Sequence, residues 1–360
     1  MIGKKVSDLD TPILWLDMAI FEKNVDTIIS YLNHTNVQWR PHIKGIKIPD
    51  IAKRLIKAGA IGVTCAKLGE AEDMAKGGID HILIANQIIG SQKIERLVKL
   101  CKENDITVAV DDPVNATEIS RAAVKANVKP GIVIEVNIGM NRAGINPGEQ
   151  ALAVAKHIMT LPSVEFRGVM GWEGHVVSIQ DVVEKEDKVK QAITKLTETA
   201  SLIRSQGIPV EMVSCGGSGS YRFTATMPGV TEIQTGGSVF GDLTYNAWGA
   251  GTENALFVQV AVSSHVNPGW AVIDAGRKTF NCERVMPACI EYPQFKLTAL
   301  SSEHGVLAIP EGSSNLKPGD KLTFIPGYED WTVFLHDKLV GIRNGFVEEV
   351  WDITGRGKLT

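Results

Sequence analysis

The spacing of apolar residues along the chain changes near Gly241. Before that point, short β-branched runs alternate with longer segments whose apolar residues recur every three or four positions, such as KIPDIAKRLIKAG and SQKIERLVKLCKEN. This alternation predicts βα units around a parallel sheet. The runs are VQWRP, IGVTCA, HILIAN, ITVAVD, GIVIEVN, EFRGVMG, EMVSCG and TEIQTG. Eight units favour a closed TIM-like (β/α)8 barrel over an open sheet, because closure removes both exposed edges.

Beyond Gly241 the apolar residues alternate with period two, which is typical of antiparallel strands. The turn Arg343-Asn344-Gly345 has the composition of a hairpin connection. The early run PILWLD has no barrel strand before it with which to pair. We therefore expect a barrel over residues 13–245 and a C-terminal antiparallel β domain over 246–360, joined by residues 1–12. The expected strands of this domain are FVQVAVSSHV, WAVIDAG, KLTAL, KLTFIPG, KLVGIRNG and FVEEVWDI.

Composition adds limits on partners. The 360 residues suffice for a barrel of roughly 250 residues and a second unit of roughly 100. A net charge of -4 with 22% charged residues offers no basic excess for nucleic acid or anionic lipid. The polar start MIGKKVSDLD and the lack of an apolar run of roughly 18 residues predict a cytoplasmic protein without a membrane span. Five scattered cysteines without a CxxC pair favour reduced thiols.

Polar residues are expected to gather at one rim of the barrel. The carboxyl ends of the parallel strands in such a barrel converge on the face that carries reactive groups. In this chain, ionisable or amide side chains follow five of the expected strands. They are Arg40, His42 and Lys44; Asn86 and Gln87; Asp111 and Asp112; Asn137 and Arg142; and Trp172, Glu173 and His175.

The seventh and eighth expected strands end in glycine-rich turns. The first reads Cys215-Gly216-Gly217-Ser218-Gly219-Ser220 and the second Gly236-Gly237-Ser238. A single turn of this kind is more often only a tight turn. Two of them after strands seven and eight favour a phosphate site, since backbone N–H groups there can bind an anion without obstruction by Cβ atoms.

Lys44 is the candidate nucleophile. An isolated lysine is usually a solvated surface charge, but Lys44 ends a barrel strand within RPHIK, on the rim that also carries the glycine turns. Apolar surroundings and the cation of Arg40 or Arg142 favour a neutral amine, the form that attacks an aldehyde. Lys47 is the rival, although it is expected to lie in the loop beyond the strand.

At these residues the chain resembles the D-threonine aldolase and D-serine dehydratase family of fold-type III pyridoxal-phosphate (PLP) enzymes, relatives of the alanine racemase barrel. The resemblance covers nearly the whole length. The matching segments are TPILWLD, RPHIKGIK, GVTCAKLGEAE, ILIANQ, VNIGMNRAG, RGVMGWEGH, VSCGGSGS, EIQTGGSVFGD, IDAGRKTF, SSEHGVL and GDKLTFIPGYEDWTV.

The resemblance implies roles for individual residues. Lys44 would form the Schiff base with PLP, and Arg142 would lie near the ring oxygen of the cofactor. Trp172 stands where relatives commonly have a tyrosine beside the cofactor, and packing at the rim is an equal alternative. His175 would be a general base or a hydrogen-bonding anchor. The phosphate would be held by Gly216, Gly217, Ser218 and Gly219 with Ser220, Gly237 and Ser238.

Three departures from the family pattern bear on the reaction. Where relatives read PNHxCxT or PNHxDxT and bind a divalent metal, this chain has Tyr328 in place of the histidine and keeps only Asp330. A lone carboxylate beside a neutral phenol is a poor metal site, so a metal requires Glu329 or His304 to complete it. Ile46 replaces a common histidine, and Ser238 replaces a common aromatic residue.

Three enzyme activities follow from the resemblance. The leading one is a lyase that cleaves a D-β-hydroxy amino acid to glycine and an aldehyde, with Lys44, His175, Tyr328 and Arg142 as catalytic residues. The alternatives are a racemase or epimerase that uses Lys44 and Tyr328 as opposed bases, and a D-serine dehydratase-like ammonia-lyase, which the loss of the metal histidine disfavours.

A PLP-binding protein without turnover is the non-enzymatic alternative, disfavoured by the complete β domain. The family also implies a homodimer in which Tyr328 and Asp330 lie across the interface from Lys44. The partner in every enzyme hypothesis is a small amino acid. Its side chain, its stereochemistry and the presence of a metal are left open by the sequence.

Overall fold

The computed structural model describes residues 1–312 and 316–360, which form two compact units. The barrel unit comprises Ile28–Gly236, Trp248–Ala250 and Gly357–Thr360. The sheet unit comprises Met1–Thr27, Gly237–Ala247 and the described part of Gly251–Arg356. These units are defined by their internal contacts and do not show which segments fold independently. The domain bounds 13–245 and 246–360 therefore stay a prediction.

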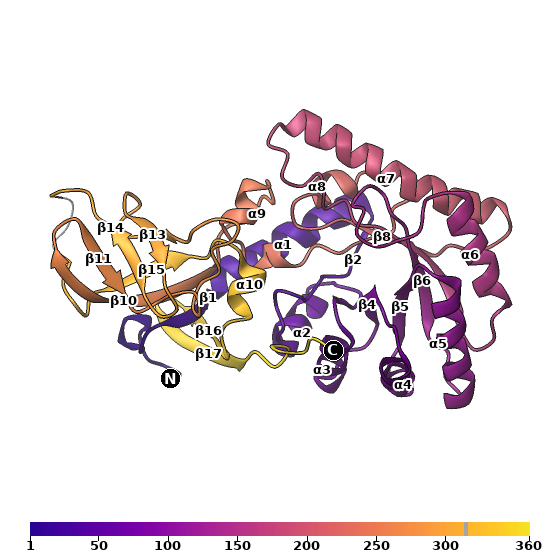
Figure 1. The fold of residues 1–360 in the computed structure, drawn as a ribbon, viewed down its shortest axis with the longest axis horizontal. Helices are drawn as coiled ribbons and strands as arrows, with labels where there is room; N and C mark the ends of the chain where they lie inside the picture. Colours follow the sequence, from indigo (N-terminus) through magenta and orange to yellow (C-terminus); the bar gives the residue numbers. More distant parts are fainter. Residues whose placement is uncertain (313–315) are drawn as a thin grey trace. The chain divides into compact units, whose positions relative to one another are not determined.

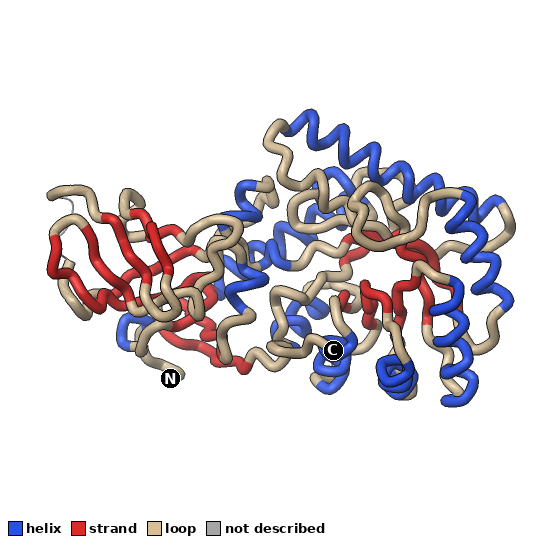
Figure 2. The backbone as a smooth tube through the Cα atoms, in the orientation of Figure 1, coloured by secondary structure: helices blue, strands red, loops and turns tan. Residues whose placement is uncertain are grey.

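The barrel unit contains the eight strands that the sequence predicted, all parallel (Figures 1 and 2). Their order is β2-β9-β8-β7-β6-β5-β4-β3. The (β/α)8 TIM-like fold class is thus confirmed. The strands are β2 (Gln38–Trp39), β3 (Val63–Cys65), β4 (Ile82–Gln87), β5 (Ile106–Val110), β6 (Gly131–Glu135), β7 (Glu165–Met170), β8 (Met212–Cys215) and β9 (Glu232–Ile233).

Hydrogen bonds between β3 and the residues after β2 join the two ends of this sheet. Ile43 N donates to Thr64 O at 2.8 Å, and Thr64 N donates to Pro41 O at 2.9 Å. His42 and Thr64 form a parallel bridge at the same place. The segment that carries Lys44 therefore closes the barrel, which fixes its backbone where β2 ends.

Helices α2 to α8 follow barrel strands, α1 follows β1, and two of them begin at side-chain caps. Asp112 accepts a hydrogen bond from Val114 N at 2.6 Å, and Asp181 accepts one from Glu184 N at 2.8 Å. Such side-chain caps satisfy N–H groups that have no partner within the helix. The helices are α1 (Met18–Thr35), α2 (Pro49–Lys57), α3 (Leu68–Lys76), α4 (Ser91–Leu100), α5 (Pro113–Ala126), α6 (Glu149–Thr160), α7 (Val182–Ser205) and α8 (Tyr221–Thr224).

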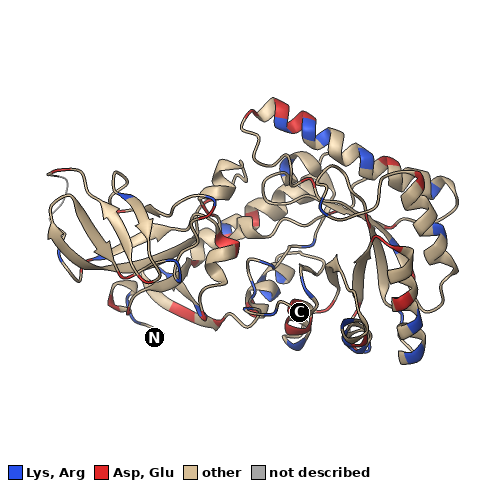
Figure 3. Ribbon diagram, viewed as in Figure 1, with Lys and Arg blue, Asp and Glu red and all other residues tan. Residues whose placement is uncertain are grey.

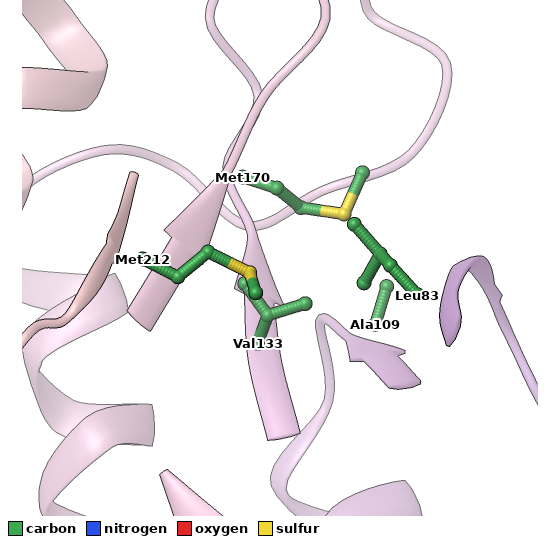
Figure 4. Packing of buried hydrophobic residues seen from close by; sticks show 5 residues of the cluster. All are labelled: Leu83, Ala109, Val133, Met170 and Met212. Atoms are coloured by element: carbon green, nitrogen blue, oxygen red, sulfur yellow. The ribbon is translucent and has the colours of Figure 1, made fainter. Parts of the chain in front are cut away.

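One apolar layer fills the interior of the barrel. Consecutive strands β4 to β8 contribute one side chain each, and these point toward one another (Figure 4). All are buried, so the interior is a packed core and not a pore. Chemistry is thereby confined to the rim. The layer consists of Leu83, Ala109, Val133, Met170 and Met212.

The sheet unit is mostly antiparallel, with the strand path β13-β14-β11-β10-β1-β16-β17, and β15 pairs with β10 and β12. This confirms the C-terminal β domain of the predicted fold class. Asn344 and Gly345 both have positive φ, as the expected hairpin between β16 and β17 requires. The strands are β1 (Ile13–Asp17), β10 (Leu256–Asn267), β11 (Trp270–Ile273), β12 (Ala288–Cys289), β13 (Lys296–Leu300), β14 (Gly305–Ala308), β15 (Lys321–Ile325), β16 (Lys338–Arg343) and β17 (Phe346–Asp352).

The first strand explains the early run without a barrel partner. β1 pairs antiparallel with β10 and parallel with β16, so it is an interior strand of the second sheet. The short strands β12 and β14 were not predicted from the pattern. Short helices complete the sheet unit: η1 (Val6–Asp8), η2 (Gly237–Val239), α9 (Leu243–Ala247) and α10 (Glu329–Val333).

Charged residues of both signs are interspersed along α7 (Figure 3). Within the described residues, none of the helices combines the length and the apolar character needed to cross a bilayer.

Candidate functional site

Lys44 lies two residues beyond His42, the residue that forms the parallel bridge to Thr64 of β3, and it is partly buried. Its backbone N–H donates to His42 Nδ1 at 3.4 Å. Burial lowers the pKa of His42 well below its usual value, and the charges of Lys44, Lys47 and Arg142 lower it further. Two cations from the segment after β2 and one from the loop after β6 therefore act on one imidazole, which makes this part of the rim electropositive.

The rival Lys47 is part of the fold. Its Nζ lies 2.5 Å from Glu70 Oε1, and both side chains are almost fully buried. The other carboxylate oxygen of Glu70 accepts Ala66 N at 2.7 Å and so caps α3. The charge of Lys47 is thus compensated at the base of a helix, which leaves Lys44 as the better candidate nucleophile.

The sequence analysis proposed Arg40 as one of two cations that act on Lys44. In the structure its guanidinium pairs with a different residue. Its Nε and Nη2 bind the carboxylate of Glu232 at 3.0 Å each, and its Nη1 donates to His81 O at 2.7 Å. This bidentate pair joins β2 to β9, so Arg40 stabilises the barrel wall. Arg142 is the remaining cation of that proposal.

Arg142 lies in the loop after β6 and is largely exposed. Its Nη2 is 3.9 Å from Glu135 Oε1, and Glu135 also accepts Gln87 Nε2 at 2.6 Å. Burial raises the pKa of Glu135, while the Gln87 hydrogen bond and Arg142 oppose that rise. These contacts link the ends of β4 and β6 at the rim, where the sequence analysis expected polar side chains to gather.

The glycine loop after β8 is shaped by close contacts that exclude side chains. A Cβ atom at Gly217 would lie 2.4 Å from Trp172 Cη2, and one at Gly219 would lie 3.0 Å from Val177 Cβ and 3.1 Å from Trp248 Cβ. Gly216 has φ of +77°, a conformation that side chains disfavour. The loop backbone therefore packs directly against the Trp172 ring without side chains between them, and this arrangement fits a phosphate cradle next to a planar cofactor.

Trp172 is now seen to pack on this loop, which was one of its two predicted roles; direct cofactor contact stays a prediction. Ser218 is 6% exposed, and its hydroxyl accepts Thr235 Oγ1 at 3.3 Å. Gly237 and Ser238 belong to η2 in the sheet unit, where a Cβ at Gly237 would lie 2.1 Å from Glu329 Oε1. Packing within that unit alone requires the glycine, so their role in phosphate binding also stays a prediction.

His175 lies on the exposed loop after β7. A Cβ at Gly139 would lie 2.6 Å from its Nε2, so the imidazole rests on the loop after β6. Burial lowers the pKa of His175, and the charge of Lys195 lowers it further. The ring is therefore neutral at physiological pH, the state that a general base needs.

Tyr328 and Asp330 form a hydrogen-bonded pair in the sheet unit. Tyr328 Oη donates to Asp330 Oδ2 at 2.8 Å, and Tyr245 Oη donates to Asp330 Oδ1 at 3.5 Å. Burial raises the pKa of Tyr245 well above its usual value. The guanidinium of Arg284 lies 4.8 Å from the Tyr328 ring centroid. Both carboxylate oxygens thus accept phenol hydrogens.

These donors do not fit a divalent metal. A phenol that donates its proton to the Asp330 carboxylate offers a cation neither charge nor a suitable lone pair. Among residues 1–312 and 316–360, no three His, Cys, Asp or Glu side chains come together as a cation site. His304 is exposed, and the Glu329 side chain is buried.

Glu173 is a residue whose role the sequence analysis missed. It was noted at the rim but given no task. The structure shows it fully buried, in contact with the glycine loop through Gly216, Ser220 and Thr224. An acidic residue shortly after one buried strand, with the hydroxyl residues Ser220 and Thr224 after the next strand, was the available signal.

Comparison with known proteins supplies a family. Residues 16–244 match the alanine racemase N-terminal domain, and residues 255–342 match a putative serine dehydratase domain. A D-threonine aldolase of Arthrobacter sp. is 35% identical over 359 residues, which span 99% of this chain and 95% of the relative. A 3-hydroxy-D-aspartate aldolase of Paracoccus denitrificans is 35% identical over 371 residues, 99% of this chain and 94% of the relative.

A solved structure agrees with these matches. The crystal structure of D-threonine aldolase from Filomicrobium marinum superimposes with a TM-score of 0.97 at 33% identity, covering 100% of this chain and 99% of that one. The similarity therefore extends over both units and not only over the barrel.

Proposed function

The chain belongs to the alanine racemase N-terminal domain family, and on this basis we propose that it is a PLP-dependent lyase that cleaves a D-β-hydroxy amino acid to glycine and an aldehyde. One observation carries the proposal. Lys44 follows β2 and the glycine loop Gly216–Gly219 follows β8 of the same barrel, at the rim where such barrels hold their reactive groups.

The barrel offers a holder for each part of the cofactor. Lys44 Nζ would bind the aldehyde, and Trp172 and Arg142 would contact the ring. The phosphate would be bound at the Ser218-Gly219 tip of the glycine loop, whose shape Gly216 and Gly217 set through their own hydrogen bonds to Glu173 and Ser220. When bound, PLP draws electrons from the substrate α-carbon and so eases the breaking of a bond there. Which bond breaks depends on where the protein places its proton acceptor.

His175 is the proposed proton acceptor for the β-hydroxyl group. Its neutral imidazole can take the hydroxyl proton, and removal of that proton is what retro-aldol cleavage requires. Tyr328, which donates to Asp330, is retained as a second candidate. Cleavage makes no demand for a Lewis acid, whereas expulsion of hydroxide by a dehydratase does. The poor fit of Asp330 and Tyr328 to a metal therefore favours the lyase.

The products of one incubation distinguish the three activities. Purified protein reconstituted with PLP is mixed with D-threonine, and glycine, acetaldehyde, ammonia and the enantiomeric ratio are followed together. Glycine and acetaldehyde in equal amounts support the lyase. Loss of chirality without aldehyde indicates a racemase, and ammonia with a 2-oxo acid indicates a dehydratase; either result overturns the proposal.

The attachment point has its own test. Borohydride reduction followed by peptide mass spectrometry is expected to find pyridoxyl on Lys44. Lys44→Ala should lose the label, while Lys53→Ala, a change at an exposed residue of α2 paired with Asp50, should retain it. A labelled Lys44→Ala protein would contradict the assignment.

The proposal includes a homodimer in the cytoplasm. All five cysteines are free thiols, which supports a reducing compartment. Light scattering of the holoenzyme over a dilution series, with activity measured in parallel, checks the dimer. A fully active monomer would remove that part of the proposal.

A further inference from the structure

Glu173 lies beneath the glycine loop and contacts both of its ends. Its Oε2 accepts Gly216 N at 3.3 Å, where the loop begins, and its Oε1 accepts Ser220 Oγ at 2.6 Å, where the loop ends. Oε1 also accepts Thr224 Oγ1 at 2.8 Å from the following helix α8. One carboxylate thus closes a turn of five residues from below.

The same hydroxyl that binds Glu173 orders the middle of the loop. Ser220 Oγ accepts Gly217 N at 3.1 Å, and the backbone N–H groups of Ser220 and Tyr221 donate to Gly217 O at 3.0 and 2.9 Å. These bonds use the amides on either side of the Ser218-Gly219 tip to hold the turn. The tip is therefore held between residues that one hydrogen-bond network, anchored on the Glu173 carboxyl group, fixes in place.

Burial makes this arrangement costly, which argues that it has a purpose. Glu173 is 0% exposed, and burial raises its pKa while the bonds from Ser220, Thr224 and Gly216 oppose that rise. A buried acid needs its hydrogen bonds, because burial without them leaves a polar group unsatisfied. An apolar residue at this position would leave Gly216 N–H and the hydroxyls of Ser220 and Thr224 without this acceptor.

We propose that Glu173 is the positioning residue of the phosphate-binding loop, holding Gly216 and Ser220 so that the tip of the loop fits the phosphate of the cofactor. This inference rests on the proposed function. Glu173 acts through the loop and not on the reacting atoms. Its loss should therefore weaken binding of the phosphate group and leave binding of the pyridine ring and aldehyde nearly unchanged.

Two cofactor forms separate these contributions. PLP and pyridoxal share the ring and the aldehyde and differ in the phosphate. Their dissociation constants are measured by absorbance titration for wild type, Glu173→Gln and Glu173→Ala. We expect Glu173→Ala to weaken PLP binding by at least about tenfold, equivalent to about 1.4 kcal/mol, and pyridoxal binding by less than about twofold. Glu173→Gln should fall between, because an amide can replace one acceptor but not both.

A matched control is Glu70→Gln, a buried carboxylate of α3 in the same barrel that pairs with Lys47 and accepts a hydrogen bond from Ala66 N. It should change both dissociation constants by similar factors, if at all. Ser220→Ala and Thr224→Val are milder variants for the case in which Glu173→Ala does not fold. Each should selectively weaken PLP binding, with Ser220→Ala the stronger because Ser220 also contacts Gly217.

The outcomes are distinct. Equal weakening of PLP and pyridoxal in the Glu173 variants would show a general structural role and overturn the inference while leaving the proposed function intact. Unchanged PLP binding in all variants would do the same. A wild-type protein that binds neither form would overturn the proposed function itself and, with it, the inference.

Discussion

The phenol of Tyr328 donates a 2.8 Å hydrogen bond to Asp330, at the two positions where the family resemblance of the sequence implies a histidine and a second metal ligand. The pair is buried, and Tyr245 approaches the second oxygen of the same carboxylate. In this chain, hydrogen bonds from two phenols to a carboxylate therefore occupy the place where the resemblance implies metal ligands. The relationship gives the first of five predictions.

Wild-type holoenzyme is expected to contain at most about 0.1 divalent metal ion per chain, because the site lacks the ligands that a metal needs. Its reaction rate should be unchanged by a chelator. Tyr328→His should create metal binding, because an imidazole beside Asp330 supplies a nitrogen ligand. Metal content by inductively coupled plasma mass spectrometry checks both. Tyr328→Phe, which adds no ligand, is the control. Stoichiometric metal in the wild type would contradict the prediction.

Gly217→Ala is expected to lower the affinity for PLP, because its Cβ would lie 2.4 Å from the Trp172 ring and force the ring or the loop to move. Overpacking of this kind typically costs about 1 to 3 kcal/mol. Absorbance titration with PLP and tryptophan fluorescence report the change. Gly269→Ala is the control, since no atom lies within 4 Å of its Cβ. Unchanged binding in Gly217→Ala would mean that the cradle is elsewhere.

The pH dependence of kcat/KM should show an acid limb from His175. Because burial and Lys195 lower the pKa of this imidazole, it stays neutral down to a pH below the usual 6.5 and loses its basic form only as pH falls through its own pKa. His175→Gln should lower kcat/KM by about 10²- to 10⁴-fold and abolish that limb. His157→Gln, on α6 and bonded to Thr117, should keep the wild-type profile. An acid limb that survives in His175→Gln would remove the residue from the role of base.

Asp105 should stabilise the barrel at neutral pH and lose this effect in acid. Burial alone would raise its pKa, but hydrogen bonds from Arg167 and His81 outweigh burial, and the net pKa is below 3.8. A carboxyl group with a lowered folded-state pKa stabilises the protein fully above its unfolded pKa, and the benefit disappears as pH falls through the folded pKa. Wild type should therefore exceed Asp105→Asn in urea midpoint at pH 7, and the gap should close below about pH 3.8. A gap independent of pH would mean that packing, and not charge, is responsible.

Breaking the Arg40–Glu232 pair should destabilise the protein strongly. The two side chains are 10% and 3% exposed, so Arg40→Met leaves an uncompensated buried carboxylate, at a cost of about 3 to 5 kcal/mol. The double variant Arg40→Met/Glu232→Leu removes both charges and should recover most of that loss. Urea unfolding followed by circular dichroism measures each. A double variant no more stable than the single one would show that β2 and β9 depend on the ion pair itself.

Much of the fold was predictable because it depends on local periodicity. All eight barrel strands were found from short β-branched runs, and the Asn344-Gly345 hairpin from its composition. β12 and β14, of two and four residues, were missed, whereas the equally short β2 and β9 were found because each lies within a longer run that was recognised, VQWRP and TEIQTG. At the site, the rim positions of Lys44 and Arg142 followed from strand ends alone, whereas the task of Glu173 did not.

The sequence by itself determined which segments are strands, which ends carry polar groups and where glycine must stand, since each depends on neighbours within a few residues. Only the tertiary structure decided that β1 belongs to the second sheet, that Arg40 pairs with Glu232 across 192 residues, and that Glu173 binds hydroxyls 47 and 51 residues further on. The physical reason is that periodicity reports which face of a segment is buried, whereas partners are selected by the order in which strands assemble around the barrel.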